Sequence, residues 1–192
     1  MKLSPIVAGM WRLQEWGLDT PALVQWIEQA LALGITSFDH ADIYGGYTVE
    51  AAFGQALAAA PGLRRQMQIV TKCGIKLVSP ERPAHRIKSY DSSRAHVLAS
   101  VDNSLRALHT DHIDLLLLHR PDLLMDPDEL ADAMRLLLAA GKVLNFGVSN
   151  HTPGQVAMLR KRVPVATHQI EFSVLQMKAL ADGTLEQCVD LG

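Results

Sequence analysis

Strand-like and helix-like segments alternate six times along this chain of 192 residues. The strand-like segments are short apolar runs, at residues 6–8, 35–38, 67–71, 113–118, 143–148 and 165–170. Each is followed by a longer stretch whose apolar residues recur at helical spacing. Regular alternation of this kind predicts an α/β fold with a parallel sheet and helical crossover connections. The length favours one domain, residues 1–192, with a single core.

Helix-start signals support the same pattern. Thr20 followed by Pro21 predicts a helix start, because threonine favours the N-cap and proline favours the first turn. The sequence from Asp126 to Glu129 predicts a capping box, in which side chains and backbone N–H groups bond reciprocally. Further helices are expected to begin near Val49, Ser93, Thr152 and Thr184.

Two architectures fit this alternation, an open doubly wound sheet and a (β/α)8 TIM barrel. An open dinucleotide-binding sheet carries a glycine-rich turn after its first strand, whereas here that turn reads Gly9-Met10-Trp11-Arg12. In a barrel, polar residues gather at the C-terminal ends of successive strands. Such ends carry Asp39, Lys72, His119, Ser149, Asn150 and Gln169. The barrel is therefore favoured.

The number of units falls short of a closed barrel. Closure needs eight βα units, and about six are recognisable here. We therefore expect an incomplete barrel, truncated after the sixth unit, whose first and sixth strands are unpaired edges. Because exposed strand edges invite pairing with other chains, such a chain is expected to be poorly stable or to self-associate.

The composition is typical of a soluble globular protein, with 48% hydrophobic and 20% charged residues. A net charge of -2 without a clustered basic face argues against nucleic-acid binding. No run approaches the ~18 apolar residues that a membrane span needs, and residues 1–5 lack the layout of a signal peptide. Two cysteines, Cys73 and Cys188, make no disulfide framework. We expect reduced thiols in a cytoplasmic protein of unspecified oligomeric state.

Four residues at or near strand ends suggest proton transfer. Asp39 ends the second predicted strand, and Tyr44 follows it at a tight loop containing two glycines. Tyrosine has an ordinary pKa near ~10, and a nearby lysine cation such as Lys72 lowers it. Asp39 would pair with Lys72, and His119 would orient a substrate oxygen or share the proton. Tyr44 is then the general acid that protonates a carbonyl oxygen.

Each residue alone also fits an ordinary structural role. Lys72 could be a solvated charge, Tyr44 a loop packing residue and His119 a histidine bonded to backbone. Convergence on one cavity favours chemistry, and the hydride must then come from a cofactor. Ser149, Asn150 and Gln169 carry hydroxyl and amide groups suited to bind a nicotinamide carboxamide.

The chain resembles the aldo-keto reductase family over essentially its whole length, and most closely its bacterial oxidoreductase members. The central matching stretch reads Asp39-His40-Ala41-Asp42-Ile43-Tyr44-Gly45. The other matching stretches are residues 9–12, 70–74, 113–122, 141–143, 147–150 and 169–171, in this order.

The resemblance implies a (β/α)8 barrel that reduces an aldehyde or ketone with NADPH. It implies a catalytic tetrad of Asp39, Tyr44, Lys72 and His119. It implies nicotinamide contacts from Ser149, Asn150 and Gln169, places Met10 and Trp11 beside the cofactor and substrate, and implies no metal.

The chain departs from the family pattern at two positions near the site and in its extent. His40 stands where many members have threonine, and His168 where many have asparagine. In the family, later segments supply an aromatic residue that stacks on the nicotinamide and groups that hold the phosphates. The sequence ends before these segments, so we expect an intact tetrad without most of the dinucleotide anchor.

Other functions remain as alternatives. The same barrel could serve a non-catalytic cofactor-sensing or interaction protein, or the chain could be an inactive fragment. A metal-dependent hydrolase would use Asp39, Asp42, His119 and His168, although no metal-ligand spacing supports it. An aldolase would use Lys72 as a Schiff base. Trp11, Trp16 and Arg120 indicate a substrate pocket with an aromatic wall and one cation.

Overall fold

Six parallel strands form a single curled sheet in the computed structural model, which describes residues 1–191. The strands are β1 (Val7–Gly9), β2 (Ser37–Asp39), β3 (Gln68–Cys73), β6 (Leu115–Leu118), β7 (Phe146–Ser149) and β8 (His168–Gln169). Their order in the sheet, β1-β2-β3-β6-β7-β8, follows the chain without reversal. A doubly wound sheet reverses direction at its switch point, so this order is that of a partial barrel. The predicted barrel-type sheet is confirmed to that extent.

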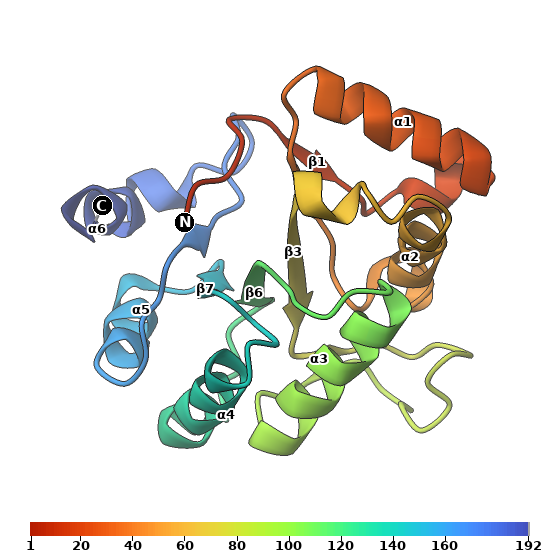
Figure 1. Cartoon of the computed structure of the whole chain (residues 1–192). Coiled ribbons are helices and arrows are strands. Elements are labelled where there is room, and N and C mark those ends of the chain that lie inside the picture. The colour runs from red at the N-terminus through yellow and green to blue at the C-terminus, as the bar shows by residue number, and fades with distance from the viewer. Residues whose placement is uncertain (192) are drawn as a thin grey trace.

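In the part of the chain that the structure describes, six α-helices lie outside the sheet, around the strands (Figure 1). They are α1 (Thr20–Ala32), α2 (Val49–Ala59), α3 (Arg94–Ala107), α4 (Pro127–Ala139), α5 (Pro153–Arg160) and α6 (Thr184–Leu191). Apolar side chains between helices and strands form two large buried clusters, one near α1 and α2 and one near α3, α4 and α5. Among the described residues, none of these helices is long and apolar enough to cross a membrane.

Strand β6 is covered on both faces, as its continuous apolar sequence predicts. Leu116 and Leu118 belong to the cluster beneath α3, α4 and α5. The two other leucines of the strand pack on the inner face of the sheet with Val70 and Leu3. The strand is shorter than predicted, because Ile113 contributes only an isolated bridge before it.

The helix starts are correct with one exception. Thr20 is not the N-cap of α1: the Asp19 carboxylate caps it by accepting a 2.9 Å hydrogen bond from the backbone N–H of Ala22. Aspartate satisfies the free N–H groups as well as threonine does and adds a favourable charge at the helix start. Ser93 caps α3, and Thr152 forms a complete capping box with Gln155.

The predicted capping box at Asp126 is only half formed. Asp126 accepts hydrogen bonds from the backbone N–H groups of Asp128 and Glu129, as expected for a cap. The carboxylate of Glu129, however, accepts a 3.0 Å hydrogen bond from the backbone N–H of Arg94. Glu129 therefore links the start of α4 to the start of α3 instead of closing its own helix.

A short antiparallel hairpin lies between β3 and α3. Its strands are β4 (Ile75–Lys76) and β5 (Ser89–Tyr90). Asp91 stabilises the hairpin through both its backbone and its side chain. Its N–H donates to Gly74 O at 3.0 Å, and its carboxylate lies 3.3 Å from Lys76 Nζ. Strands of two residues are too short to leave a periodic signal in the sequence.

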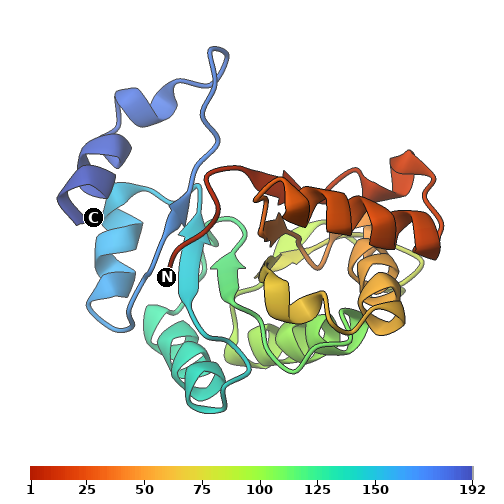
Figure 2. The same ribbon diagram turned by 45° about the horizontal axis from the view of Figure 1, so that its top comes forward.

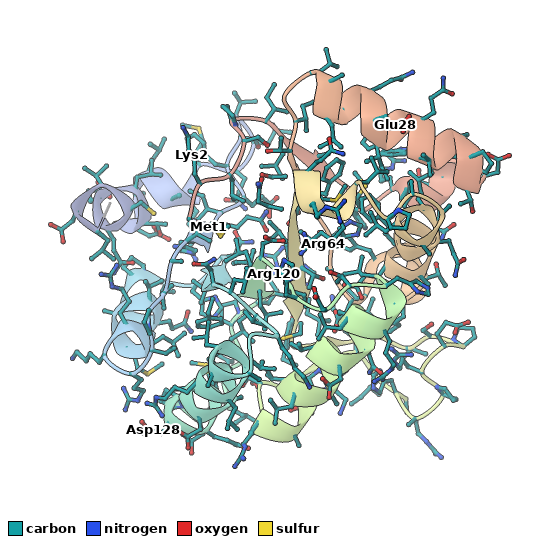
Figure 3. All side chains as sticks on the ribbon, viewed as in Figure 1. Met1, Lys2, Glu28, Arg64, Arg120 and Asp128 are labelled. Atoms are coloured by element: carbon teal, nitrogen blue, oxygen red, sulfur yellow. The ribbon has the colours of Figure 1, made fainter. Side chains whose placement is uncertain are left out.

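Arg64 links strands β3 and β6 at their N-terminal ends. Its guanidinium donates to Thr110 Oγ1, His112 O and Asp114 Oδ2 at 2.8, 2.9 and 2.7 Å, and to Met67 O at 3.2 Å. These acceptors lie at the starts of β3 and β6, so one side chain holds both strands (Figure 3).

Helices α2 and α3 approach each other closely at Gly54. A Cβ atom at this position would lie 1.9 Å from the carbonyl oxygen of Ala107 at the end of α3. No side chain fits at that distance, so the contact depends on glycine.

The N-terminal residues lie between the two edges of the sheet (Figure 2). Strands β1 and β8 each have one strand neighbour, as expected for edges. The backbone N–H of Ser4 donates to Ser37 Oγ at 2.9 Å. Leu3 lines a small cavity together with Ala166 and Thr167. The segment therefore reaches from β2 toward the start of β8.

Candidate active site

The ammonium group of Lys72 contacts two other predicted site residues, Asp39 and Tyr44, near the C-terminal ends of β2 and β3. Lys72 Nζ lies 2.7 Å from Asp39 Oδ1, 2.8 Å from His40 O and 3.1 Å from Tyr44 Oη. These three acceptors use all three ammonium hydrogens. The predicted pairing of Asp39 with Lys72 is therefore present in the structure.

Burial makes the charge of Lys72 depend on these partners. The side chain is only 2% exposed. Burial lowers the pKa of Lys72, while the charge and hydrogen bond of Asp39 oppose that shift. An ammonium group without partners at this depth would lose its proton more readily, so Asp39 holds Lys72 in the charged state.

Tyr44 begins a 3-10 turn, Tyr44–Gly46, directly above Lys72. Gly45 and Gly46 have φ angles of 58° and 64°, so the predicted tight loop is confirmed. The predicted lowering of the Tyr44 pKa is wrong. Burial, followed by the Asp39 charge, raises the pKa of Tyr44 above its ordinary value. The Asp39 carboxylate that pairs with Lys72 thus opposes ionisation of the tyrosine.

His119 follows β6 and completes the group. Its N–H extends the sheet by donating to Cys73 O at 2.9 Å. Its ring stands edge-on to the Tyr44 ring, with the ring centroids 6.0 Å apart. Burial, followed by the charges of Lys72 and Arg120, lowers the pKa of His119 to about 3. The imidazole is therefore neutral near pH 7. Its Nδ1 atom is buried without a partner among the described residues.

Ser149, Asn150 and Gln169 lie together at the ends of β7 and β8. Ser149 and Gln169 are register partners, and Asn150 N donates to Gln169 O at 2.9 Å. Asn150 has a left-handed φ of 53° and donates its amide to Ser149 Oγ at 3.2 Å. Its amide oxygen accepts from the N–H of Glu171 at 2.8 Å. Among the described residues, the side-chain amide of Gln169 has no hydrogen-bond partner.

The structure separates the two remaining predicted residues, Met10 and Trp11. Met10 is completely buried in the cluster near α1 and α2, so its side chain packs in the core. Trp11 is 71% exposed. Arg120, labelled near the centre of Figure 3, forms a long ion pair of 3.9 Å with Glu171. The contact of Met10 and Trp11 with a cofactor stays a prediction.

His40 and His168, the two positions that differ from the family pattern, each make a contact that does not involve the site. His40 is fully buried and its ring stands edge-on to Phe53, with the centroids 4.5 Å apart. His168 Nε2 accepts a 3.0 Å hydrogen bond from the backbone N–H of His151. Neither contact involves the tetrad side chains.

Glu50 is a buried acidic residue beside the site that sequence patterns do not single out. It is 5% exposed and accepts a 2.6 Å hydrogen bond from the hydroxyl of Thr71. One signal is present: Glu50 stands on the apolar face of α2, next to Val49 and one turn before Phe53 and Gly54. A charge on a buried helix face indicates a specific partner.

The alternatives that use a metal or a Schiff base find little support in the geometry. Within residues 1–191, no three His, Cys, Asp or Glu side chains are placed to hold a metal ion. A Schiff base at Lys72 would leave Nζ at most one hydrogen for the three hydrogen bonds to Asp39, His40 O and Tyr44.

Comparison with known families places this site in context. A family model described as "Aldo/keto reductase family" matches residues 5–192. Among curated proteins, "Uncharacterized oxidoreductase YcsN" of Bacillus subtilis (strain 168) is 52% identical over 190 residues, which are 98% of this chain and 63% of that protein. "Oxidoreductase YdhF" of Escherichia coli (strain K12) is 51% identical over 192 residues, covering 99% and 64%. "6-dehydroglucose reductase" of Agrobacterium fabrum is 47% identical over 188 residues, covering 96% and 63%.

Solved structures agree with these matches. The glycerol dehydrogenase AKR11B4 of Gluconobacter oxydans superposes with a TM-score of 0.81 at 31% identity, covering 95% of this chain and 55% of that one. The holo form of the aldo-keto reductase AKR11C1 of Bacillus halodurans gives 0.80 at 27% identity, covering 97% and 59%. The chain spans 63–64% of the length of the first three curated relatives.

Proposed function

The chain belongs to the aldo/keto reductase family, and from that premise we propose that it reduces an aldehyde or ketone to an alcohol with NADPH. One observation carries the proposal: a single buried ammonium, Lys72, bonds both Asp39 and the Tyr44 hydroxyl. A buried pair of this kind is costly to maintain without a function for it. NADPH, when bound, supplies the hydride for the carbonyl carbon.

Tyr44 is the general acid in this proposal. Because an ammonium can only donate, Tyr44 Oη is the acceptor in its hydrogen bond to Lys72. The hydroxyl proton must therefore point elsewhere, and no acceptor for it occurs among the described residues. A substrate carbonyl oxygen above Tyr44 would receive this proton. The raised pKa of Tyr44 keeps the proton in place before reaction, and Lys72 stabilises the tyrosinate that forms afterwards.

His119 orients the carbonyl oxygen in this proposal. Its lowered pKa keeps the ring neutral near pH 7, so one ring nitrogen carries a proton and the other does not. A neutral imidazole beside Tyr44 donates one hydrogen bond to a substrate oxygen without competing as an acid. Proton donation is thereby left to Tyr44.

The residues at the ends of β7 and β8 fit a nicotinamide carboxamide. Asn150 is held at both ends of its amide, to Ser149 and to the N–H of Glu171. Within residues 1–191, the side-chain amide of Gln169 has no hydrogen-bond partner and Ser149 does not donate its hydroxyl hydrogen. A carboxamide, which both donates and accepts, suits such a set. Ser149, Asn150 and Gln169 would hold it in this proposal.

The proposed substrate class rests on the family and on the names of relatives. Two of them are named 6-dehydroglucose reductase, at 47% and 39% identity. We therefore include 6-dehydroglucose among the carbonyl compounds to test.

Turnover with purified protein tests the function. The protein as its gene encodes it is incubated with NADPH or NADH and with a panel of aldehydes, ketones and 6-dehydroglucose. We expect consumption of NADPH that depends on the carbonyl compound, with NADH less effective. Binding of NADPH without turnover of any compound would favour a cofactor-sensing protein instead.

A further inference from the structure

Two buried carboxyl groups flank Tyr44 in the chain without contacting its hydroxyl. Asp42 precedes it and Glu50 follows it, and they are only 7% and 5% exposed. Burying a carboxyl group costs free energy unless the structure uses it. Neither group contacts the Lys72 ammonium, whose three hydrogen bonds go elsewhere. Their contacts lie instead on strand β3 and helix α3.

Glu50 ties the start of α2 to β3. Its Oε1 accepts the 2.6 Å hydrogen bond from Thr71 Oγ1, and both residues are buried. Thr71 directly precedes Lys72, so its side chain leaves the opposite face of the strand. Glu50 lies in the first turn of α2, where the helix dipole favours a negative charge. The bond therefore fixes the C-terminal end of the Tyr44 loop, which we define as residues 40–48.

Asp42 fixes the other end of the Tyr44 loop, through its backbone to β3 and through its side chain to α3. Its backbone N–H donates to Lys72 O at 3.0 Å. Its Oδ2 accepts a 3.3 Å hydrogen bond from Ser100 Oγ on α3. Its Oδ1 is buried without a partner among the described residues. Asp42 and Glu50 both line a cavity of about 220 Å³. The loop is thus held on both sides of Tyr44 by consecutive residues of β3, Thr71 and Lys72.

Burial favours the neutral form of both carboxyl groups. Burial raises the pKa of both, and the negative charge of Glu50 raises that of Asp42 further. The Thr71 and Ser104 hydroxyl groups lower the pKa of Glu50 and so oppose its shift. The Thr71 bond to Glu50, at 2.6 Å, is much shorter than the Ser100 bond to Asp42, at 3.3 Å, and is the stronger of the two side-chain ties.

We propose that Asp42 and Glu50 are positioning residues, which hold the Tyr44 hydroxyl against the Lys72 ammonium by fixing both ends of the Tyr44 loop. The Glu50 carboxyl ties one end to β3 through Thr71, and the Asp42 carboxyl ties the other end to α3 through Ser100. Tyr44 and Lys72 come from different elements, and their hydrogen bond needs a fixed distance between the loop and the strand. The catalytic part of this inference rests on the proposed function. The geometric part, that these ties order residues 40–48, does not.

The sharpest test removes the donor of the stronger tie. Thr71→Val deletes the hydroxyl at nearly constant shape, and Thr71→Ser keeps it as the matched control. For Thr71→Val we expect kcat to fall about 10- to 100-fold, because a displaced acid loses that much. The KM for NADPH should change less than about threefold, since cofactor binding does not use the tie. Thr71→Ser should stay near wild type. Wild-type kcat in Thr71→Val overturns the proposal.

A second pair of variants tests the acceptor. Glu50→Gln retains an oxygen for Thr71 and should restore most of the kcat that Glu50→Ala loses. Glu28→Gln, on the exposed outer side of α1 (Figure 3), is the surface control and should have no effect. Equal loss of kcat in Glu50→Gln and Glu50→Ala would show that the hydrogen bond is not what matters, and would overturn the proposal.

Amide hydrogen exchange decides the geometric part without any activity. In Thr71→Val, exchange in residues 40–48 should rise at least about fivefold, while α4 and α5 keep wild-type exchange. Unchanged exchange in residues 40–48, or an equal rise throughout the protein, overturns the positioning role. If the wild-type protein reduces no carbonyl compound, the proposed function fails, and this comparison still decides the inference.

Discussion

The ammonium of Lys72 donates a 3.1 Å hydrogen bond to the hydroxyl of Tyr44, although 28 positions separate the two residues in the chain. Lys72 lies within a strand and Tyr44 in a turn after the neighbouring strand. Parallel strands end at the same edge of the sheet, which brings such residues together. The direction of the bond leaves the tyrosine proton free for another acceptor.

Tyr44→Phe should abolish carbonyl reduction. Loss of a general acid removes about 10²- to 10⁴-fold in rate. NADPH binding should stay within a few-fold, because Tyr44 is not among the proposed nicotinamide contacts. Tyr90→Phe removes a hydroxyl from a half-exposed tyrosine and serves as control. Steady-state rates and NADPH titrations of both variants provide the measurement. Wild-type-like turnover in Tyr44→Phe would contradict the assignment of Tyr44 as the general acid.

Lys72→Met should abolish turnover and also destabilise the fold. It leaves the Asp39 carboxylate, only 14% exposed, without its ion pair, and breaking a buried pair costs about 3–5 kcal/mol. Lys142→Met breaks a pair with the same 2.7 Å distance to Asp102 that is about 40% exposed on both sides. That variant should lose less than about 1 kcal/mol. Denaturant unfolding of the two variants gives the comparison, and equal losses would contradict the buried pairing.

The buried histidine His40 should make the fold acid-sensitive. Burial lowers its pKa to about 3, so below the unfolded pKa of about 6.5 only the unfolded chain takes up a proton. Protonation of this histidine leaves the free energy of unfolding unaffected above pH 6.5. As the pH falls toward 3, the free energy of unfolding decreases, by about 2 kcal/mol at pH 5. We expect the free energy of unfolding of His40→Thr to fall less between pH 7 and 5 than that of wild type, by about this amount.

Two features make this pH comparison specific. The raised pKa values of Asp42 and Glu50 act in the opposite direction, and they cancel because the variant keeps both groups. His109→Asn replaces an exposed histidine at a left-handed φ of 51° and is the control. An identical pH slope in wild type and His40→Thr would rule out the buried neutral histidine as a source.

Gly54→Ala should destabilise the protein strongly. The new Cβ would lie 1.9 Å from Ala107 O, so α2 and α3 must separate, and overpacking costs about 1–3 kcal/mol. Gly154→Ala is the matched control in α5, where a Cβ meets nothing within 4 Å. That change should stabilise the helix slightly, by up to about 1 kcal/mol. Thermal and denaturant unfolding of both variants measure the difference. A neutral Gly54→Ala would contradict the close approach.

The sequence predicts the sheet and the Asp39, Lys72 and Tyr44 contacts because both follow from strand order. Alternating apolar runs specify parallel strands, and residues at their C-terminal ends meet at one edge. The limits of the strands are less predictable. The last predicted strand, residues 165–170, pairs as a strand only at His168–Gln169. Periodicity indicates burial, whereas pairing also needs a neighbour in register.

Electrostatic details depend on distances that no sequence pattern contains. Lys72 adjacent to Tyr44 predicts a lowered tyrosine pKa, yet burial and the Asp39 charge raise it. The Glu50 contact with Thr71 joins positions 21 apart and needs the packing of α2 on β3. Met10 likewise matches a family motif near the cofactor, and only its complete burial shows that the side chain packs in the core.

Arg64 gives the two ends of the sheet different tolerance to change. Its guanidinium holds the starts of β3 and β6 through Thr110, His112 O and Asp114, all remote from the ends that carry Lys72 and His119. Insertions or substitutions in the loops around the site leave this anchor untouched. If the proposed function is right, loop exchange can change substrate preference, in evolution or in the laboratory, while the strand register that aligns the proposed acid Tyr44 with Lys72 is inherited unchanged.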